Sequence, residues 1–95
     1  MELTTSSNTL SIAGNIKSVN DFQAIKTAAN EIIAKNSEIS IVIENSLSIT
    51  SSIIGYFNKL VLKDGIKINM RVGNPQLMEL LEDLSLTSIF NVRSF

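Results

Sequence analysis

Cysteine and histidine are both missing from this chain of 95 residues. Without cysteine there are no disulfide bonds and no thiolate metal sites, which suits a reducing compartment. Without histidine, only carboxylates, lysines and hydroxyls remain for catalysis. The acids Asp21, Glu31, Glu38 and Glu44 fall in different predicted elements. No pair of them is placed for acid–base work, so we expect no enzyme, metal site or cofactor.

Aromatic residues and net charge are scarce as well. The chain has one tyrosine, four phenylalanines and a formal net charge of −1. This composition predicts neither a base-stacking surface nor the basic footprint of a nucleic-acid-binding protein. No run reaches the ~20 apolar residues of a membrane span. Met1–Ser6 lacks the basic and apolar regions of a secretion signal. We therefore expect a cytoplasmic domain that inserts into no membrane.

Hydrophobic residues make up 44% of the chain, which is enough for a core that needs no disulfide bonds or metal sites to stabilise it. No linker or repeat divides the sequence, so residues 1–95 are predicted to form a single domain. Period-two alternation of apolar residues predicts strands at Leu10–Ile16, Ile39–Ile43 and Ile66–Val72. A further strand at Glu2–Ser6 would pair with the first of these through a turn at Ser7-Asn8.

Helical spacing predicts a first helix that begins at Ser18 and fades near Asn36. Asp21, three residues after Ser18, completes a capping box in which the serine and the acid satisfy backbone groups of the first turn. The predicted inner stripe of this helix consists of Val19, Phe22, Ile25, Ala29, Ile32 and Ile33.

Two more helices follow. One starts at Ser51 or Ser52 and stops at Asp64-Gly65, where glycine supplies a left-handed end. The next is capped by Asn74, with Pro75 at its first position. Their predicted buried residues are Ile53, Phe57, Leu60 and Val61 in the former, and Leu77, Met78, Leu81 and Leu84 in the latter.

The resulting order is ββαβαβα, with a short tail in which Leu86–Val92 forms a helical turn or a strand. Strands that alternate with helices imply right-handed crossovers and mostly parallel pairing after the first hairpin. We therefore predict an α/β fold with a small mixed sheet of four to five strands. The strict alternation in Ile66–Val72 places the helices mainly on one face of that sheet.

The hydroxyl-rich start of the second helix offers the most specific chemistry in the chain. Ser51 and Ser52 stand where a side-chain oxygen can cap a helix, a role whose loss costs ~0.5–2 kcal/mol. They also stand where backbone N–H groups tolerate an added phosphate. Both interpretations stay open, and Ser52 is an equal candidate for the cap, with Ser51 then facing outward.

Four segments resemble the STAS domain, the sulfate transporter and anti-sigma factor antagonist family, over about Leu10 to Val92. The segment Ile49-Thr50-Ser51-Ser52-Ile53-Ile54-Gly55 is similar to the family signature Ile-Asp-Ser-Ser-Gly-Leu-Gly. Leu10–Ile16 resembles the early strand of the family, and Ile41–Glu44 resembles its strand that ends in an acid or amide. Ser85–Phe90 resembles the C-terminal Gly-Leu-x-x-Leu-Phe.

The resemblance implies a bacterial regulatory protein that acts by partner switching. Ser51 matches the serine that a histidine-kinase-like serine kinase, also the anti-sigma factor, phosphorylates and a phosphatase resets; Ser52 and Thr50 are the fallback acceptors. Phosphorylation would weaken binding to the kinase. The expected partner-binding surface consists of Thr50, Ser51, Ser52, Ile54, Tyr56 and Lys59, on a monomer or weak homodimer.

The signature departs from the family at two positions. Thr50 replaces the aspartate, and Ile53 replaces the first glycine. These changes favour an alternative, in which the chain is a constitutive STAS-type adaptor subunit of an envelope or lipid-transport complex, without phospho-regulation.

Overall fold

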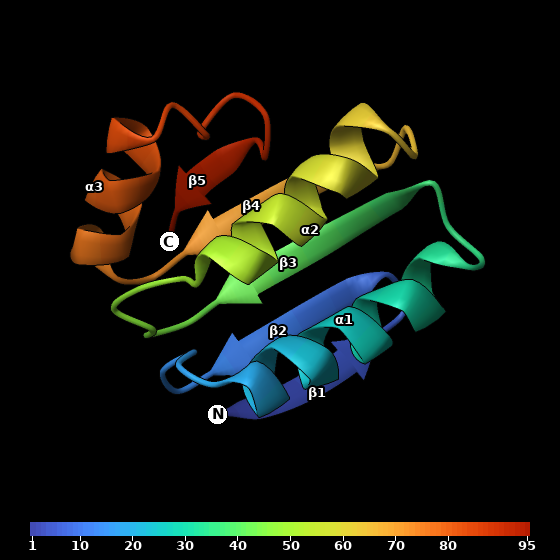
Figure 1. Cartoon of the computed structure of the whole chain (residues 1–95), viewed down its shortest axis with the longest axis horizontal. Coiled ribbons are helices and arrows are strands. Elements are labelled where there is room, and N and C mark those ends of the chain that lie inside the picture. Colours follow the sequence, from blue (N-terminus) through green and yellow to red (C-terminus); the bar gives the residue numbers. More distant parts are fainter.

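The computed structural model describes residues 1–95 as a five-stranded sheet with three helices (Figure 1). This confirms the predicted α/β class and the mixed sheet. The elements in chain order are β1 (Glu2–Ser6), β2 (Thr9–Ala13), α1 (Val19–Ile33), β3 (Glu38–Ile43), α2 (Ser51–Leu62), β4 (Lys67–Val72), α3 (Pro75–Asp83) and β5 (Val92–Ser94).

The strands lie side by side in the order β1-β2-β3-β4-β5. The hairpin strands β1 and β2 are antiparallel, and every later pair is parallel. Parallel strands need crossovers, which α1, α2 and α3 supply. As a result, the loops after β2, β3 and β4 and the starts of all three helices lie at the same end of the sheet.

The boundaries of two elements differ from prediction. Strand β2 ends at Ala13 rather than Ile16, because Gly14 adopts a φ of 89° that breaks the extended backbone. Ile16 is nevertheless buried, so the alternation that suggested a longer strand came from a loop residue packed into the core. The tail forms a turn and then a strand, β5, which pairs with β4.

The core lies between the helices and one face of the sheet. β3 and β4 contribute apolar side chains at every second residue, as the period-two pattern predicted. Phe57 of α2 meets Phe90 edge to face, with ring centroids 6.0 Å apart. Burying an aliphatic or aromatic side chain of this size contributes about 1.5–3 kcal/mol. The 22 buried apolar residues form one continuous cluster.

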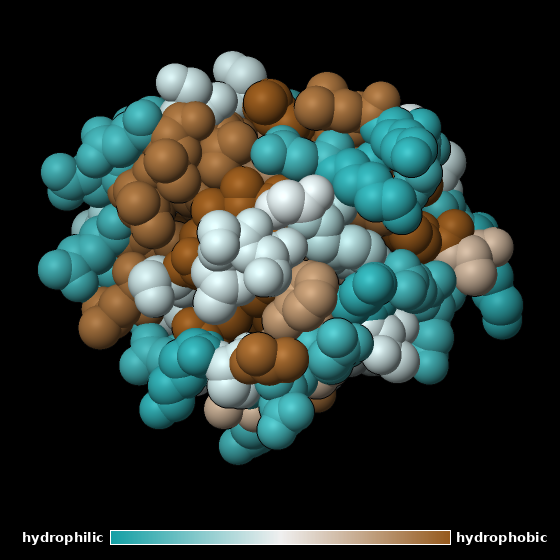
Figure 2. All heavy atoms as spheres, in the orientation of Figure 1, coloured by the Kyte–Doolittle hydropathy of each residue, from teal (hydrophilic) through white to brown (hydrophobic).

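The outer faces of the elements are polar. Figure 2 shows teal side chains around the rim of the molecule, and brown ones gathered where Figure 1 places α3 and the segment after it. Leu84, predicted to be buried, is 48% exposed there, because it follows the last residue of α3. No helix combines the length and the apolarity that crossing a membrane requires.

Candidate functional site

The predicted phospho-acceptor segment lies at the end of the sheet where the helices begin. Two loops meet beneath it: residues 14–18, which follow β2, and residues 44–50, which follow β3. Ser46, the only buried polar residue of the chain, belongs to the second loop and contacts the first. Its hydroxyl accepts a hydrogen bond from the Ile16 N–H (3.1 Å) and donates one to the Ser48 carbonyl (2.7 Å).

Two asparagines join the same loops in both directions. The Asn45 side-chain oxygen accepts from the Gly14 N–H at 2.7 Å, and the Asn15 side-chain oxygen accepts from the Leu47 N–H at 3.0 Å. Three side chains therefore satisfy backbone groups across a sequence gap of about thirty residues. The loops form one hydrogen-bonded platform, and the start of α2 rises from it.

Thr50, and neither serine, caps α2. Its backbone is extended (φ −79°, ψ 154°), and its hydroxyl accepts a hydrogen bond from the Ile53 N–H at 3.3 Å. The suggestion that Ser51 or Ser52 is the cap is therefore wrong. Both serines lie inside the first turn and are exposed. Thr50 itself is half-buried and already engaged, which makes it the least available of the three predicted acceptors.

A cavity of about 350 Å³ opens between the starts of α1 and α2. The sequence analysis placed Val19 in the inner stripe of α1, but the side chain is 74% exposed. Val19 is the first residue of its helix, so it projects past the end of the core. The residues that line the cavity are Lys17, Ser18, Val19, Phe22, Gln23, Thr50 and Ser52.

Lys17, Val19 and Phe22 were not predicted to belong to the site. A local signal was available, because Val19 lies within the capping box that fixes where α1 begins, and Lys17 and Phe22 flank it. The missing information was that this helix start faces the start of α2.

Of the other three residues predicted for partner binding, Tyr56 is the clearest correction. It is only 7% exposed, because it packs between α1 and α2. Its hydroxyl donates to the Asn30 side-chain oxygen. Burial, helped by the charge of Asp64, raises the Tyr56 pKa to about 12. An enclosed phenol of this kind cannot anchor a partner on the surface.

Ile54 and Lys59 occupy different parts of α2. Ile54 is half-buried near the serines. Lys59 is exposed and lies about 12 Å further along the helix from Ser51, at ~1.5 Å per residue. There it pairs with Asp64 at 3.7 Å. The structure thus brings Thr50, Ser51 and Ser52 together, while Lys59 lies toward the other end of the helix.

The electrostatics of the two helix starts differ. At α1, Asp21 accepts hydrogen bonds from the N–H groups of Lys17 (3.0 Å) and Ser18 (3.3 Å). The Lys17 N–H is the largest of the influences that hold the pKa of Asp21 below its usual value. The first turn of α2 contains no acid. Its positive end therefore has no negative group to balance it.

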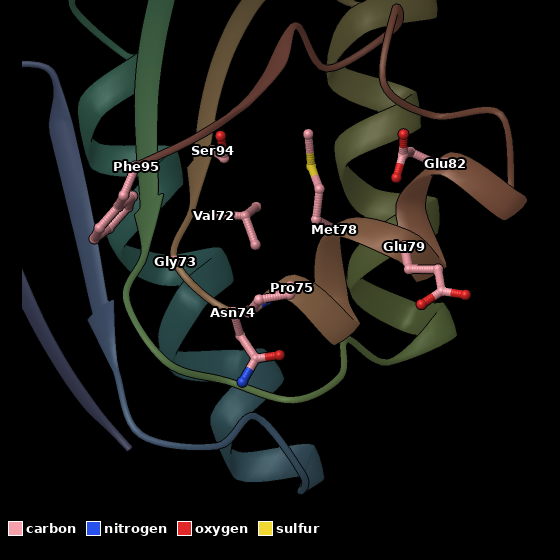
Figure 3. A pocket seen from close by; sticks show the side chains of 9 residues that line it. All are labelled: Val72, Gly73, Asn74, Pro75, Met78, Glu79, Glu82, Ser94 and Phe95. Carbon is pink, nitrogen blue, oxygen red and sulfur yellow. The ribbon is translucent and has the colours of Figure 1, made fainter.

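A larger cavity, of about 520 Å³, lies beside α3 (Figure 3). Glu79 and Glu82 stand on the α3 side, and Phe95 stands across from them with its ring directed away from the helix. Gly73 forms part of the wall, where a β-carbon would overlap the Glu44 carbonyl oxygen. This cavity is separate from the one beside Ser52.

No group of three or more acids forms a potential metal site. Comparison with protein-family models, with curated proteins and with solved structures gives no match for this chain. The assignment of a function therefore depends on the geometry at the start of α2 and on the resemblance of its sequence to the STAS signature.

Proposed function

We propose that this chain is a non-catalytic protein-binding module, similar to an anti-sigma factor antagonist, in a partner switch controlled by phosphorylation of Ser51. The observation that carries the proposal is the division of roles at the start of α2. Because Thr50 caps the helix, the Ser51 hydroxyl is not needed as the cap, and Ser51 is exposed.

The start of α2 is suited to receive a phosphate. A phosphoserine carries roughly −1.5 to −2 charges. The first N–H groups of a helix lack partners within it, and the helix dipole favours negative charge there. Because no acid occupies the first turn of α2, the added charge would meet no local repulsion. The fold should therefore tolerate the modification, and its effect would fall on the partner.

The cavity that Thr50 and Ser52 line, next to Ser51 in the chain, contains two apolar side chains among its seven lining residues. Val19 is exposed, and Phe22 lines the cavity between the helix starts together with Lys17 and Ser52. A dianion pressed into such a contact is disfavoured by desolvation, so phosphorylation would release the partner. The proposed partner is a histidine-kinase-like serine kinase that is also the anti-sigma factor, and a phosphatase would restore binding.

A constitutive adaptor is the second candidate, and Thr50 is the observation that favours it. The family signature has an acid at this position, and Thr50 supplies a cap without a charge. A kinase that recognises the acid would lose that contact. In this case the chain would serve an envelope or lipid-transport complex, and the exposed serines would have no regulatory role.

Pull-downs from the native host with three baits, namely wild type, Ser51→Ala and Ser51→Asp, separate the two candidates. The switch predicts that wild type and Ser51→Ala recover a histidine-kinase-like ATPase and that Ser51→Asp loses it. Ser37→Asp, which changes an exposed serine in the loop between α1 and β3, is the matched charge control and should behave as wild type.

Intact-mass measurement of the chain isolated from the same host tests for phosphate directly. If all three baits recover the same transporter or structural component, and the isolated chain carries no phosphate, the switch is refuted and the adaptor is supported.

A further inference from the structure

The face of the sheet opposite the helices carries two arginines side by side at one edge. Along β4, Ile68, Met70 and Val72 point into the core, so Lys67 and Arg71 project from the opposite face. Lys67 pairs in register with Glu38 of β3, which has the opposite charge. Arg71, in contrast, pairs in register with Arg93 of β5. Like charges side by side on neighbouring strands destabilise a sheet. The one ion pair of the chain joins Lys59 to Asp64, so neither arginine is neutralised.

An apolar hollow adjoins these arginines. The Phe95 side chain is 64% exposed, and the Arg71 guanidinium lies 5.9 Å from the centre of its ring. Val42, Arg71 and Phe95 line a cavity of about 290 Å³. We call Arg71, Arg93 and Phe95 the arginine patch. It offers cations beside a small apolar recess.

Helix α3 carries the opposite chemistry. Glu79, Glu82 and Asp83 are exposed, and no lysine or arginine occurs between Pro75 and Asp83. Two of these acids lie at the carboxyl end of the helix, where the dipole disfavours negative charge. Leu84 follows them and is 48% exposed. Figure 2 shows teal and brown side chains next to each other in this region. We call Glu79, Glu82, Asp83 and Leu84 the acidic patch.

The two patches form no ion pair with each other within one chain. Leu77 and Leu81 anchor α3 in the core on the helix side of the sheet, whereas the arginines project from the other side. Phe95 lines the cavity beside α3 together with Glu79 and Glu82, but Figure 3 shows its ring directed away from that helix. A net charge of −1 also means that two copies repel each other only weakly.

We propose that the arginine patch of one copy binds the acidic patch of a second copy. Guanidinium groups form paired, charge-assisted hydrogen bonds with carboxylates, and Leu84 of the second copy has the apolar character that suits the recess beside Phe95. Because the patches are different surfaces, each copy keeps one patch free, and the contact continues from copy to copy. This association involves neither Ser51 nor the cavity beside Ser52.

Sedimentation equilibrium of the full chain tests the proposal. We expect the average mass of the wild type to rise with protein concentration at ~20 mM salt, and the association constant to fall at least tenfold at ~500 mM salt, where charges are screened within a few ångströms. Arg71→Glu/Arg93→Glu and Glu79→Lys/Glu82→Lys should each stay monomeric alone, with circular dichroism showing that they are folded.

The decisive sample is an equimolar mixture of these two reversed variants, which should associate again because each supplies a patch that the other can bind. Lys35→Glu/Lys63→Glu has the same net charge as the first variant, but its changes lie away from both patches; it should associate as the wild type does. A monomeric wild type at low salt, or a mixture that stays monomeric, would overturn the proposal. Loss of association in the lysine control would do the same, by showing that net charge alone is responsible.

Discussion

The starts of α1 and α2 face the same cavity but are built in different ways. At α1, Ser18 and Asp21 form a complete capping box, and the carboxylate accepts two backbone N–H bonds. At α2, one threonine hydroxyl at 3.3 Å is the only cap, and no acid follows it. One helix start is thus already occupied by an anion, whereas the other is open to receive one.

This difference determines how each helix start should respond to an added negative charge. An added negative charge at α1 would compete with Asp21, while at α2 it would meet only N–H groups and exposed hydroxyls. The contrast is one reason for proposing a phospho-acceptor at the start of α2, where the sequence resemblance selects Ser51. It also predicts how substitutions at equivalent positions should differ.

We expect the largest loss of stability when the hydrogen-bonded platform beneath the two helix starts is disrupted. Ser46→Ala removes the hydroxyl that bonds the Ile16 N–H, and leaves that buried group without a partner. We expect the free energy of unfolding to fall by about 1–3 kcal/mol, measured by urea denaturation. Ser48→Ala is the control, because Ser48 joins the platform through its backbone carbonyl. Equal effects of the two changes would show that the Ser46 bonds add nothing.

The caps themselves come next. We expect Ser18→Ala and Thr50→Ala each to cost about 0.5–2 kcal/mol, with the larger loss at Ser18. Serine is the better cap, and its bond to the Asp21 N–H is shorter, at 3.1 Å. Thermal unfolding of the two variants measures the difference. A larger loss for Thr50→Ala would mean that α2 is the more tightly held start.

Local patterns were enough to predict the α1 start and most of the fold. The capping box spans only four residues, and Asn74 before Pro75 is equally local; both are confirmed. The alternating strands also determined which face of the sheet is buried. Val19 was wrongly predicted to be buried, because apolar spacing alone does not show that a residue at the end of a helix lies beyond the edge of the core.

The α2 start could not be predicted to the same depth. Thr50, Ser51 and Ser52 can all cap a helix, and only the backbone conformation of Thr50 decides between them. The platform could not be predicted from the sequence for a different reason. Asn15, Asn45 and Ser46 bond to groups about thirty residues away, and such partners leave no periodic signal.

A negative charge added at the first position of α1 or of α2 tests whether the two helix starts differ in electrostatics. We expect Ser51→Asp to raise the free energy of unfolding by about 0.3–1 kcal/mol, because it supplies the negative group that α2 lacks. Val19→Asp places the same charge at the equivalent position of α1, where Asp21 already lies, and should gain less. Differential scanning calorimetry of the two variants gives the comparison. If Val19→Asp stabilises more than Ser51→Asp, the α2 start is not the open one.

The smallest expected effect is a change in stability at acid pH, and it concerns only the start of α1. The N–H groups of Lys17 and Ser18 hold the pKa of Asp21 below its usual value of 3.8, so this carboxylate adds stability above that pH and loses it as the pH falls through the folded-state pKa. Asp21→Asn cannot titrate. The difference in melting temperature between wild type and Asp21→Asn should therefore be constant at neutral pH and shrink below about pH 4. Thermal melts across this range measure it, and the other carboxylates cancel in the subtraction. A difference that stays constant down to the lowest pH would mean that Asp21 stabilises α1 without its charge, and the two helix starts would then differ in hydrogen bonding but not in electrostatics.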